Sequence, residues 1–147
     1  MKEYDTMKLE IESKSVNEGF ARAAVGAFLA RLDPELEELN DIKTAVSEAV
    51  TNCIVHAYPD RIGSIHISVR VDAAGFARIA VRDRGIGITD VEQARTALFT
   101  TGGAERSGMG FTVMESFRDT VKVRSSPGTG TTVIMTRQLK RRRDARS

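Results

Sequence analysis

The sequence predicts an α/β two-layer sandwich. The stretch 36–53 repeats apolar side chains at spacings of three and four, which is typical of an amphipathic helix, and a helix-start signal at residues 15–18 predicts another helix before it. Other stretches alternate apolar with polar side chains, and turn residues join several of them, which is typical of antiparallel hairpins. Helices and hairpins of this kind bury their apolar sides by packing in two layers.

The N-terminal part of the chain predicts a strand followed by two helices. Alternating side chains predict the strand over 7–11. Ser15 and Glu18 have the spacing of a capping box, so we expect a first helix that ends near residue 31. The second helix is expected to begin at Asp33-Pro34, with the aspartate as N-cap, and to end near residue 57.

The remaining chain predicts two hairpins with a functional segment between them. The expected strands are 65–71, 77–81, 121–123 and 131–139, and a turn over 72–75 joins the first two. Asp83 follows the second of these strands. Short helices are expected to open at residue 89 and to run over 110–117, with an irregular loop over 99–107.

The composition is that of one globular domain, which we expect over residues 1–139. Of the 147 residues, 41% are hydrophobic and 29% are charged, which is ordinary for a soluble fold. No apolar run is long enough to span a bilayer and no signal-peptide pattern opens the chain, so no membrane association is expected. The single cysteine, Cys53, excludes an internal disulfide, fits a cytoplasmic protein and is expected to be buried rather than reactive.

Positive charge is concentrated at the C-terminus. Residues 140–147 contain five basic residues and one acidic residue, a net of +4, which leaves −2 on the rest of a chain whose formal charge is +2. We expect this basic tail to be disordered, with contact to nucleic acid or to an acidic partner as the alternative. No direct binding of DNA by the body is expected.

The first expected helix is rich in glycine and alanine. Glycine weakens a helix by about 1 kcal/mol relative to alanine, so these residues indicate either close packing or a partner surface. Arg22 lies within this stretch and is the expected exposed charged contact.

Three motifs in a fixed order indicate a nucleotide site. Glu48 and Asn52 are four residues apart and so share a helix face, where a carboxylate can act as a base and an amide oxygen can bind Mg²⁺. Asp83 opens an Asp-x-Gly-x-Gly run in which the glycines allow close approach. The run 107–111 places two glycines before a helical pattern, where free N–H groups can hold phosphate. Each motif alone is compatible with an ordinary turn or helix start.

These residues resemble a known superfamily and, within it, a known family. The order of the motifs is similar to that of the gyrase, Hsp90, histidine kinase and MutL ATPases. The runs 42–52, 98–101 and 105–111 are similar to anti-sigma-F factors of spore-forming bacteria, a family of small serine kinases that double as anti-sigma factors. The resemblance covers about residues 7–138.

The resemblance implies a fold, ligands and partners. The implied fold is the Bergerat-type ATP-binding fold, with a mixed, mostly antiparallel sheet covered on one face by helices. The implied protein is a homodimer that binds ATP and Mg²⁺ and sequesters a sigma factor of the sigma-F type. It phosphorylates a serine of an anti-anti-sigma factor and so controls sporulation transcription.

The resemblance also implies roles for single residues. Glu48 matches the general base that takes the proton of the substrate serine, and Asn52 matches the Mg²⁺ ligand. The adenine pocket matches Asp83, Gly85, Gly87 and Thr131, the last acting through water. The lid and phosphate cradle match Thr100, Thr101, Arg106, Ser107, Gly108, Met109, Gly110 and Phe111. We expect Arg22 to face both protein partners.

Departures and alternatives remain. Gly102-Gly103 stands where many family members have Lys-Pro, so a lid lysine contact has no match. A general stress-response kinase of the same family has identical chemistry. A nucleotide-gated binding module without kinase activity is disfavoured by the presence of Glu48. A detached histidine kinase domain is disfavoured because the first helix contains no histidine. His56 is not expected to bind a metal, because no second histidine or cysteine lies at ligand spacing.

Overall fold

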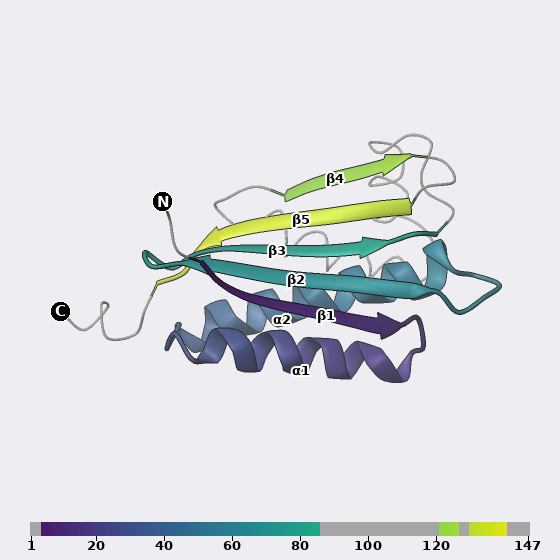
Figure 1. The fold of residues 1–147 in the computed structure, drawn as a ribbon. Helices are drawn as coiled ribbons and strands as arrows, with labels where there is room; N and C mark the ends of the chain where they lie inside the picture. Colours follow the sequence, from purple (N-terminus) through teal and green to yellow (C-terminus); the bar gives the residue numbers. More distant parts are fainter. Residues whose placement is uncertain (1–3, 86–120, 127–129, 141–147) are drawn as a thin grey trace.

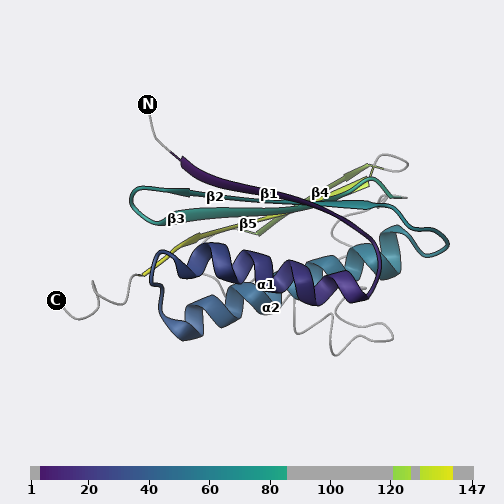
Figure 2. The ribbon, with the colours of Figure 1, turned by 60° about the horizontal axis from the view of Figure 1, so that its bottom comes forward.

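A computed structural model describes residues 4–85, 121–126 and 130–140 of the chain. Five strands of this part form one sheet, and two helices lie side by side against one of its faces (Figures 1 and 2). This arrangement confirms the predicted two-layer sandwich. The expected short helices at 89 and 110–117 and the loop over 99–107 lie outside the described residues.

The strands follow the predicted alternation. They are β1 (Tyr4–Glu12), β2 (Ser64–Asp72), β3 (Phe76–Asp83), β4 (Val121–Ser126) and β5 (Gly130–Gln138). Their order in the sheet is β1-β2-β3-β5-β4, and each neighbouring pair is antiparallel. The expected sheet was mixed and mostly antiparallel. All the pairs between its described strands are antiparallel.

Helix α1 (Val16–Ala30) confirms the first predicted helix, but the predicted capping box is wrong. Ser15 has helical backbone angles and its side chain makes no capping hydrogen bond. The Glu18 carboxylate instead accepts a hydrogen bond from the Ser47 hydroxyl on the second helix. A contact between helices thus replaces the local one, because Glu18 reaches a donor that only the folded chain places beside it.

Helix α2 (Leu36–Asn52) begins later than predicted. The N-cap position belongs to Glu35, which has an extended backbone, whereas Asp33 has φ +53°, in the left-handed region. The Asp33 N–H donates to the carbonyl of Ala30 (3.0 Å), so Asp33 ends α1 rather than starting α2. Beyond α2 the chain continues as a single π-helical turn, η1 (Cys53–Ala57), which confirms the predicted helical end.

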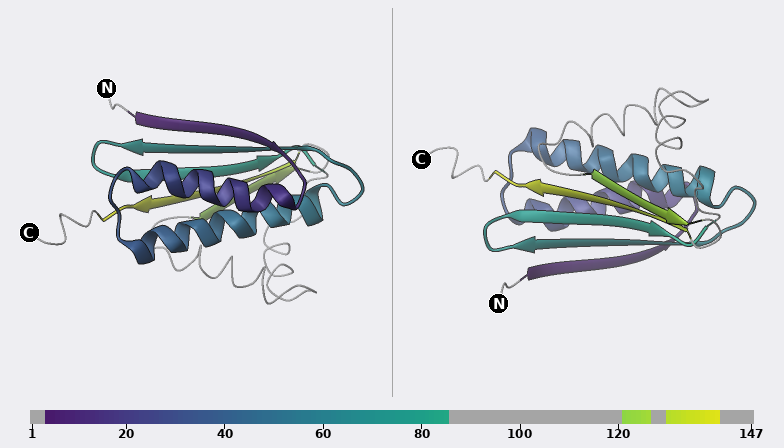
Figure 3. Two further views of the ribbon diagram at one scale, coloured as in Figure 1. Left: turned by 90° about the horizontal axis from the view of Figure 1, so that it is seen from below. Right: turned by 90° about the horizontal axis from the view of Figure 1, so that it is seen from above.

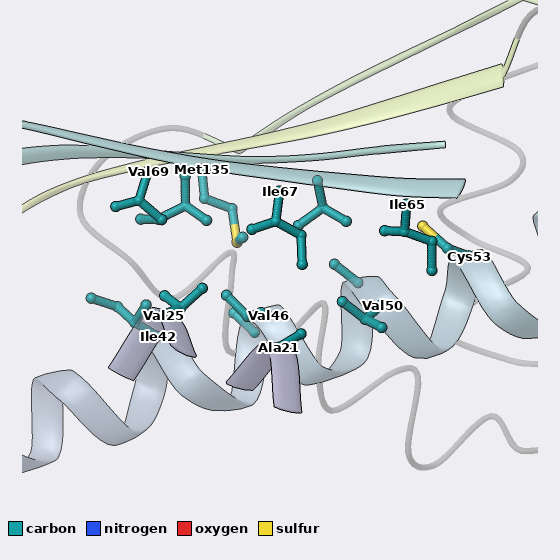
Figure 4. Packing of buried hydrophobic residues seen from close by; sticks show 14 of the residues in the cluster. Ala21, Val25, Ile42, Val46, Val50, Cys53, Ile65, Ile67, Val69 and Met135 are labelled. Atoms are coloured by element: carbon teal, nitrogen blue, oxygen red, sulfur yellow. The ribbon is translucent and has the colours of Figure 1, made fainter. Parts of the chain in front are cut away.

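The core lies between the helices and the inner face of the sheet (Figure 4). Apolar side chains of both layers interdigitate there and are shielded from water, which supplies most of the driving force for folding. The labelled members are Ala21, Val25, Ile42, Val46, Val50, Cys53, Ile65, Ile67, Val69 and Met135. Neither described helix is long and apolar enough to cross a membrane.

The small residues of α1 serve close packing only in part. Gly26 is buried against α2, where an added Cβ would lie 3.0 Å from Lys43 Cδ. Ala21 is also buried, whereas Ala23 and Ala27 are exposed. Arg22 is exposed, as predicted.

Two carboxylates, Asp72 and Glu38, accept hydrogen bonds at one end of the sandwich, and Asp83 lies at the other end of β3. Asp72 Oδ1 accepts the N–H groups of Ala74 (3.0 Å) and Phe76 (2.9 Å), which forms the predicted hairpin turn. Glu38, only 8% exposed on α2, accepts hydrogen bonds from Arg137 Nε (3.2 Å) and from the N–H of Lys140 (2.8 Å). Lys140, at the start of the basic tail, is thereby joined to the helix layer.

The helices leave the other face of the sheet uncovered. Figure 3 shows the molecule from both sides, with α1 and α2 in front of the sheet in one view and behind it in the other. No element within residues 4–85, 121–126 and 130–140 packs on that second face.

Candidate functional site

The fold brings the end of α2 and the end of β3 together. Cys53 follows Asn52 directly in the chain, and its Sγ donates a hydrogen bond to Asp83 Oδ2 at 3.6 Å. Two motifs that are thirty residues apart in the sequence therefore share one edge of the sandwich. This is the juxtaposition that a single site built from Glu48, Asn52 and Asp83 requires.

Asp83 is a buried carboxylate with a defined orientation. It is 4% exposed, and its Oδ1 accepts the backbone N–H groups of Gly85 (2.9 Å) and Thr131 (3.2 Å). These two donors compensate part of the cost of burying the charge. Thr131 thus contacts Asp83 directly through its backbone, and the role of this residue through water stays a prediction.

Glycine is required on both sides of Asp83. A Cβ on Gly85 would lie 2.3 Å from the carbonyl oxygen of Ala57, closer than any side chain allows. Gly130 has φ +109°, and a Cβ there would lie 2.2 Å from the carbonyl oxygen of Asp83. The backbone segments around the carboxylate therefore approach one another too closely for any residue with a side chain at these two positions.

Tyr58 holds the chain beyond Asp83, a role that the sequence interpretation missed. Its buried hydroxyl accepts the N–H of Arg84 (2.6 Å) and donates to the carbonyl of Ser64 (2.8 Å). Its ring occupies the space where a Cβ of Gly63 would lie. The sequence indicated only a helix break at this position; a tyrosine placed directly after a helix was the available signal.

Cys53 also has more than the packing role expected from the sequence. Burial, and then the negative charge of Asp83, raise the pKa of the Cys53 thiol well above its usual value. The thiol consequently remains protonated at neutral pH, where it is a donor to the carboxylate and a poor nucleophile. The burial of Cys53 confirms the prediction of a buried cysteine.

Glu48 and Asn52 lie one helical turn apart on α2, about 6 Å along its axis. Glu48 is 6% exposed, whereas Asn52 is half-buried. No group of three or more acidic, histidine or cysteine side chains suited to a metal occurs in the described part of the chain. A Mg²⁺ ion here would rely on one or two protein oxygens and on phosphates, which is its usual mode in phosphoryl-transfer sites.

The remaining predicted site residues fall into two groups. Arg22 lies on α1, exposed and apart from the elements that surround Asp83. The other group lies outside the described residues and comprises Gly87, Thr100, Thr101, Arg106, Ser107, Gly108, Met109, Gly110 and Phe111.

Comparison with known structures supports the fold. A histidine kinase domain from Erythrobacter litoralis matches with a TM-score of 0.60 at 21% identity, over 83% of this chain and 61% of its own. The RsbU and RsbW domains of a Mycobacterium tuberculosis protein match with a TM-score of 0.66 at 20% identity, over 93% of this chain and 32% of theirs. The chain thus has the architecture of one domain of these longer proteins.

Comparison of sequences shows the family. The model of the histidine kinase-like ATPase domain matches residues 11–137. Anti-sigma F factor from Caldanaerobacter subterraneus subsp. tengcongensis is 54% identical over 143 residues, which are 96% of this chain and 99% of the relative. Anti-sigma F factor from Pasteuria penetrans is 53% identical over 141 residues, 94% and 93% of the two chains. The chain therefore belongs to the anti-sigma F factor family, within the histidine kinase-like ATPases.

Proposed function

We propose that the chain is an ATP-dependent protein serine kinase that also sequesters a sigma factor of the sigma-F type. Its kinase substrate is a serine of an anti-anti-sigma factor, and the output is control of sporulation transcription. The observation that carries the proposal is the convergence of a buried Asp83 with the end of the helix that bears Glu48 and Asn52.

Asp83 supplies the recognition of adenine. The exocyclic amine of adenine is a donor and so requires an acceptor, and a carboxylate has about four lone-pair positions. Two backbone N–H groups occupy Oδ1, and the Cys53 thiol uses one position on Oδ2. Capacity for one further donor on Oδ2 remains, which fits the exocyclic amine of adenine.

Glu48 and Asn52 supply the chemistry of transfer. Bound ATP and its Mg²⁺ provide the phosphoryl group and neutralise its charge. Asn52 presents an amide oxygen suited to the metal. Glu48, one turn earlier on the same face, takes the proton of the substrate serine hydroxyl as the serine O–P bond forms and the bond from the γ-phosphorus to the leaving ADP breaks.

The partner and assembly assignments rest on the family. The relatives are named anti-sigma F factors, so the primary partner is a sigma factor. A homodimer is part of the proposal. The exposed Arg22 on α1 is the charged residue that we assign to contact with the sigma factor and the anti-anti-sigma factor.

Glu48→Gln tests the kinase assignment because the amide keeps the shape of the side chain and removes its basicity. Glu38→Gln is a matched control, since both glutamates are buried on α2. Purified variants are incubated with ATP, Mg²⁺ and the anti-anti-sigma protein, and phosphoserine is measured by mass spectrometry. We expect Glu48→Gln to lose at least about 100-fold in transfer rate, the range for general-base catalysis, while binding ATP normally.

The control separates catalysis from stability. Glu38→Gln weakens the contact with Arg137 and should unfold at a lower temperature while it transfers phosphate at the wild-type rate. Full transfer by Glu48→Gln would remove Glu48 from the base role. Tight ATP binding without any transfer by the wild type would favour a nucleotide-gated binding module.

A further inference from the structure

The uncovered face of the sheet carries a groove of about 650 Å³. It spans all five strands, on the side of the sheet that faces the viewer in the right panel of Figure 3. The face belongs to neither the helix layer nor the edge at which Asp83 meets α2. Its side chains have no role in the proposed kinase site.

Strand register places four cations around a small floor. Ser68, Ala80 and Ile134 lie directly opposite one another on β2, β3 and β5 and form the centre of the groove. Ala80 and Ile134 are only 8% and 7% exposed. No described element covers this face of the sheet, so the long side chains of neighbouring residues account for such burial.

The four surrounding cations come from three strands, β1, β3 and β4. Arg78 and Arg82 flank Ala80 on β3, two residues before and after it. Lys8, on β1, lies opposite Ser68 of β2, and Arg124 lies on β4. The groove therefore has a positive charge on each of its four sides.

These four charges are not neutralised within the described part of the chain. None of the four forms an ion pair with a described carboxylate, whereas Arg31 pairs with Asp5 and Arg137 with Glu38. Among its described lining residues there is one carboxylate, Glu10, which faces His66 (Oε1 to Nδ1, 3.7 Å). Four unneutralised cations held close together repel one another, and an anionic ligand relieves that repulsion.

We propose that this groove binds an acidic, extended segment of a partner protein. Residues two apart on a strand are separated by about 6.7 Å, so Arg78 and Arg82 lie about 13 Å apart. Carboxylates at positions i and i+4 of an extended segment have the same spacing and side. The small floor at Ala80 leaves space for the segment between them.

Other occupants fit the groove less well. A nucleic acid would place phosphates near Glu10, and the described lining contains no Phe, Tyr or Trp to stack on its bases; the imidazole of His66 faces Glu10. A second copy of the chain docked by the same face would bring like charges together. The tail over 140–147 is itself basic, so it is repelled from this face.

Binding of a labelled acidic peptide tests the proposal. The probe is a fluorescein-labelled decapeptide of alternating Glu and Thr, which favours an extended backbone, and the readout is fluorescence anisotropy. Two charge reversals target the groove on different strands: Arg78→Glu with Arg82→Glu, and Lys8→Glu with Arg124→Glu. The matched control reverses two exposed lysines away from the groove, Lys14→Glu with Lys140→Glu, for the same change in charge.

We expect saturable binding that weakens with added salt, and a loss of affinity of at least about 10-fold in either groove variant. The control should bind within about threefold of wild type, and circular dichroism should show the same fold in all four proteins. An equal loss in the control, or no saturable binding by the wild type, would overturn the proposal. Tighter, groove-dependent binding of a labelled thymidine decanucleotide would overturn it in favour of nucleic acid.

Discussion

Asp83→Asn is the substitution that isolates adenine recognition from folding. The amide oxygen of asparagine can keep the position of Oδ1 and accept the N–H groups of Gly85 and Thr131 at 2.9 and 3.2 Å. The amide nitrogen then occupies the position of Oδ2, where it is a donor. An adenine amine is also a donor, so the variant replaces an attraction with a clash of two donors.

The expected loss follows from the contacts. A hydrogen bond to a charged acceptor contributes about 1.5–3 kcal/mol, so ATP affinity should fall by roughly 10-fold to 150-fold. Stability should change little, because both backbone hydrogen bonds survive and the weak thiol contact can reverse, with the amide nitrogen donating to Cys53 Sγ. Guanine presents an acceptor where adenine presents its amine, so GTP should bind the wild type poorly.

Asp72→Asn is the matched control for this measurement. Asp72 also accepts two backbone N–H groups through one oxygen, but it lies in the hairpin turn at the far end of β3. Calorimetric titration with ATP and Mg²⁺ should show normal affinity for this variant. The reasoning is refuted if Asp83→Asn binds ATP within threefold of wild type, if Asp72→Asn loses as much, or if the wild type binds ATP and GTP equally.

Three further predictions concern the metal, the partners and the thiol. Asn52→Ala should lose the part of ATP affinity that depends on Mg²⁺, so titrations with and without the metal should converge. Arg22→Ala should weaken binding of the sigma factor or the anti-anti-sigma factor with no change in melting temperature; unchanged affinity for both moves the partner surface off α1. Folding raises the pKa of the Cys53 thiol, so the unfolded chain loses this proton first as pH rises. The thiol's contribution to the free energy of unfolding is therefore complete below the ordinary thiol pKa of about 8.5. Above that pH the contribution falls, by up to about 1.4 kcal/mol per pH unit. Urea unfolding of Cys53→Ala should show a shallower decline over that alkaline range, and parallel curves would argue against it.

Patterns local to the chain were enough to predict the layers of the fold. Apolar alternation in β1, β2 and β3 and the three-to-four spacing in α2 directly encode which side of each element is buried. The runs 42–52, 98–101 and 105–111 indicated the family for the same reason, since they are short and contiguous.

Only the tertiary structure decided how side chains far apart in the chain are paired. Glu18 has the spacing of a capping residue, yet it binds Ser47 because packing of α1 on α2 brings that hydroxyl within reach. In the sequence Cys53 has the pattern of an ordinary core residue, whereas in the fold it lies beside Asp83 at the end of β3 and donates a hydrogen bond to it.

The basic groove depends entirely on non-local pairing. Its cations are scattered from β1 to β4 in the sequence, and each strand by itself shows ordinary alternation. A shift of one residue in any strand would move its side chains to the opposite face, so the register of β1, β2, β3, β5 and β4 decides that the charges converge. The alternation within one strand encodes which face each side chain takes, but not which residues of the neighbouring strands lie beside it.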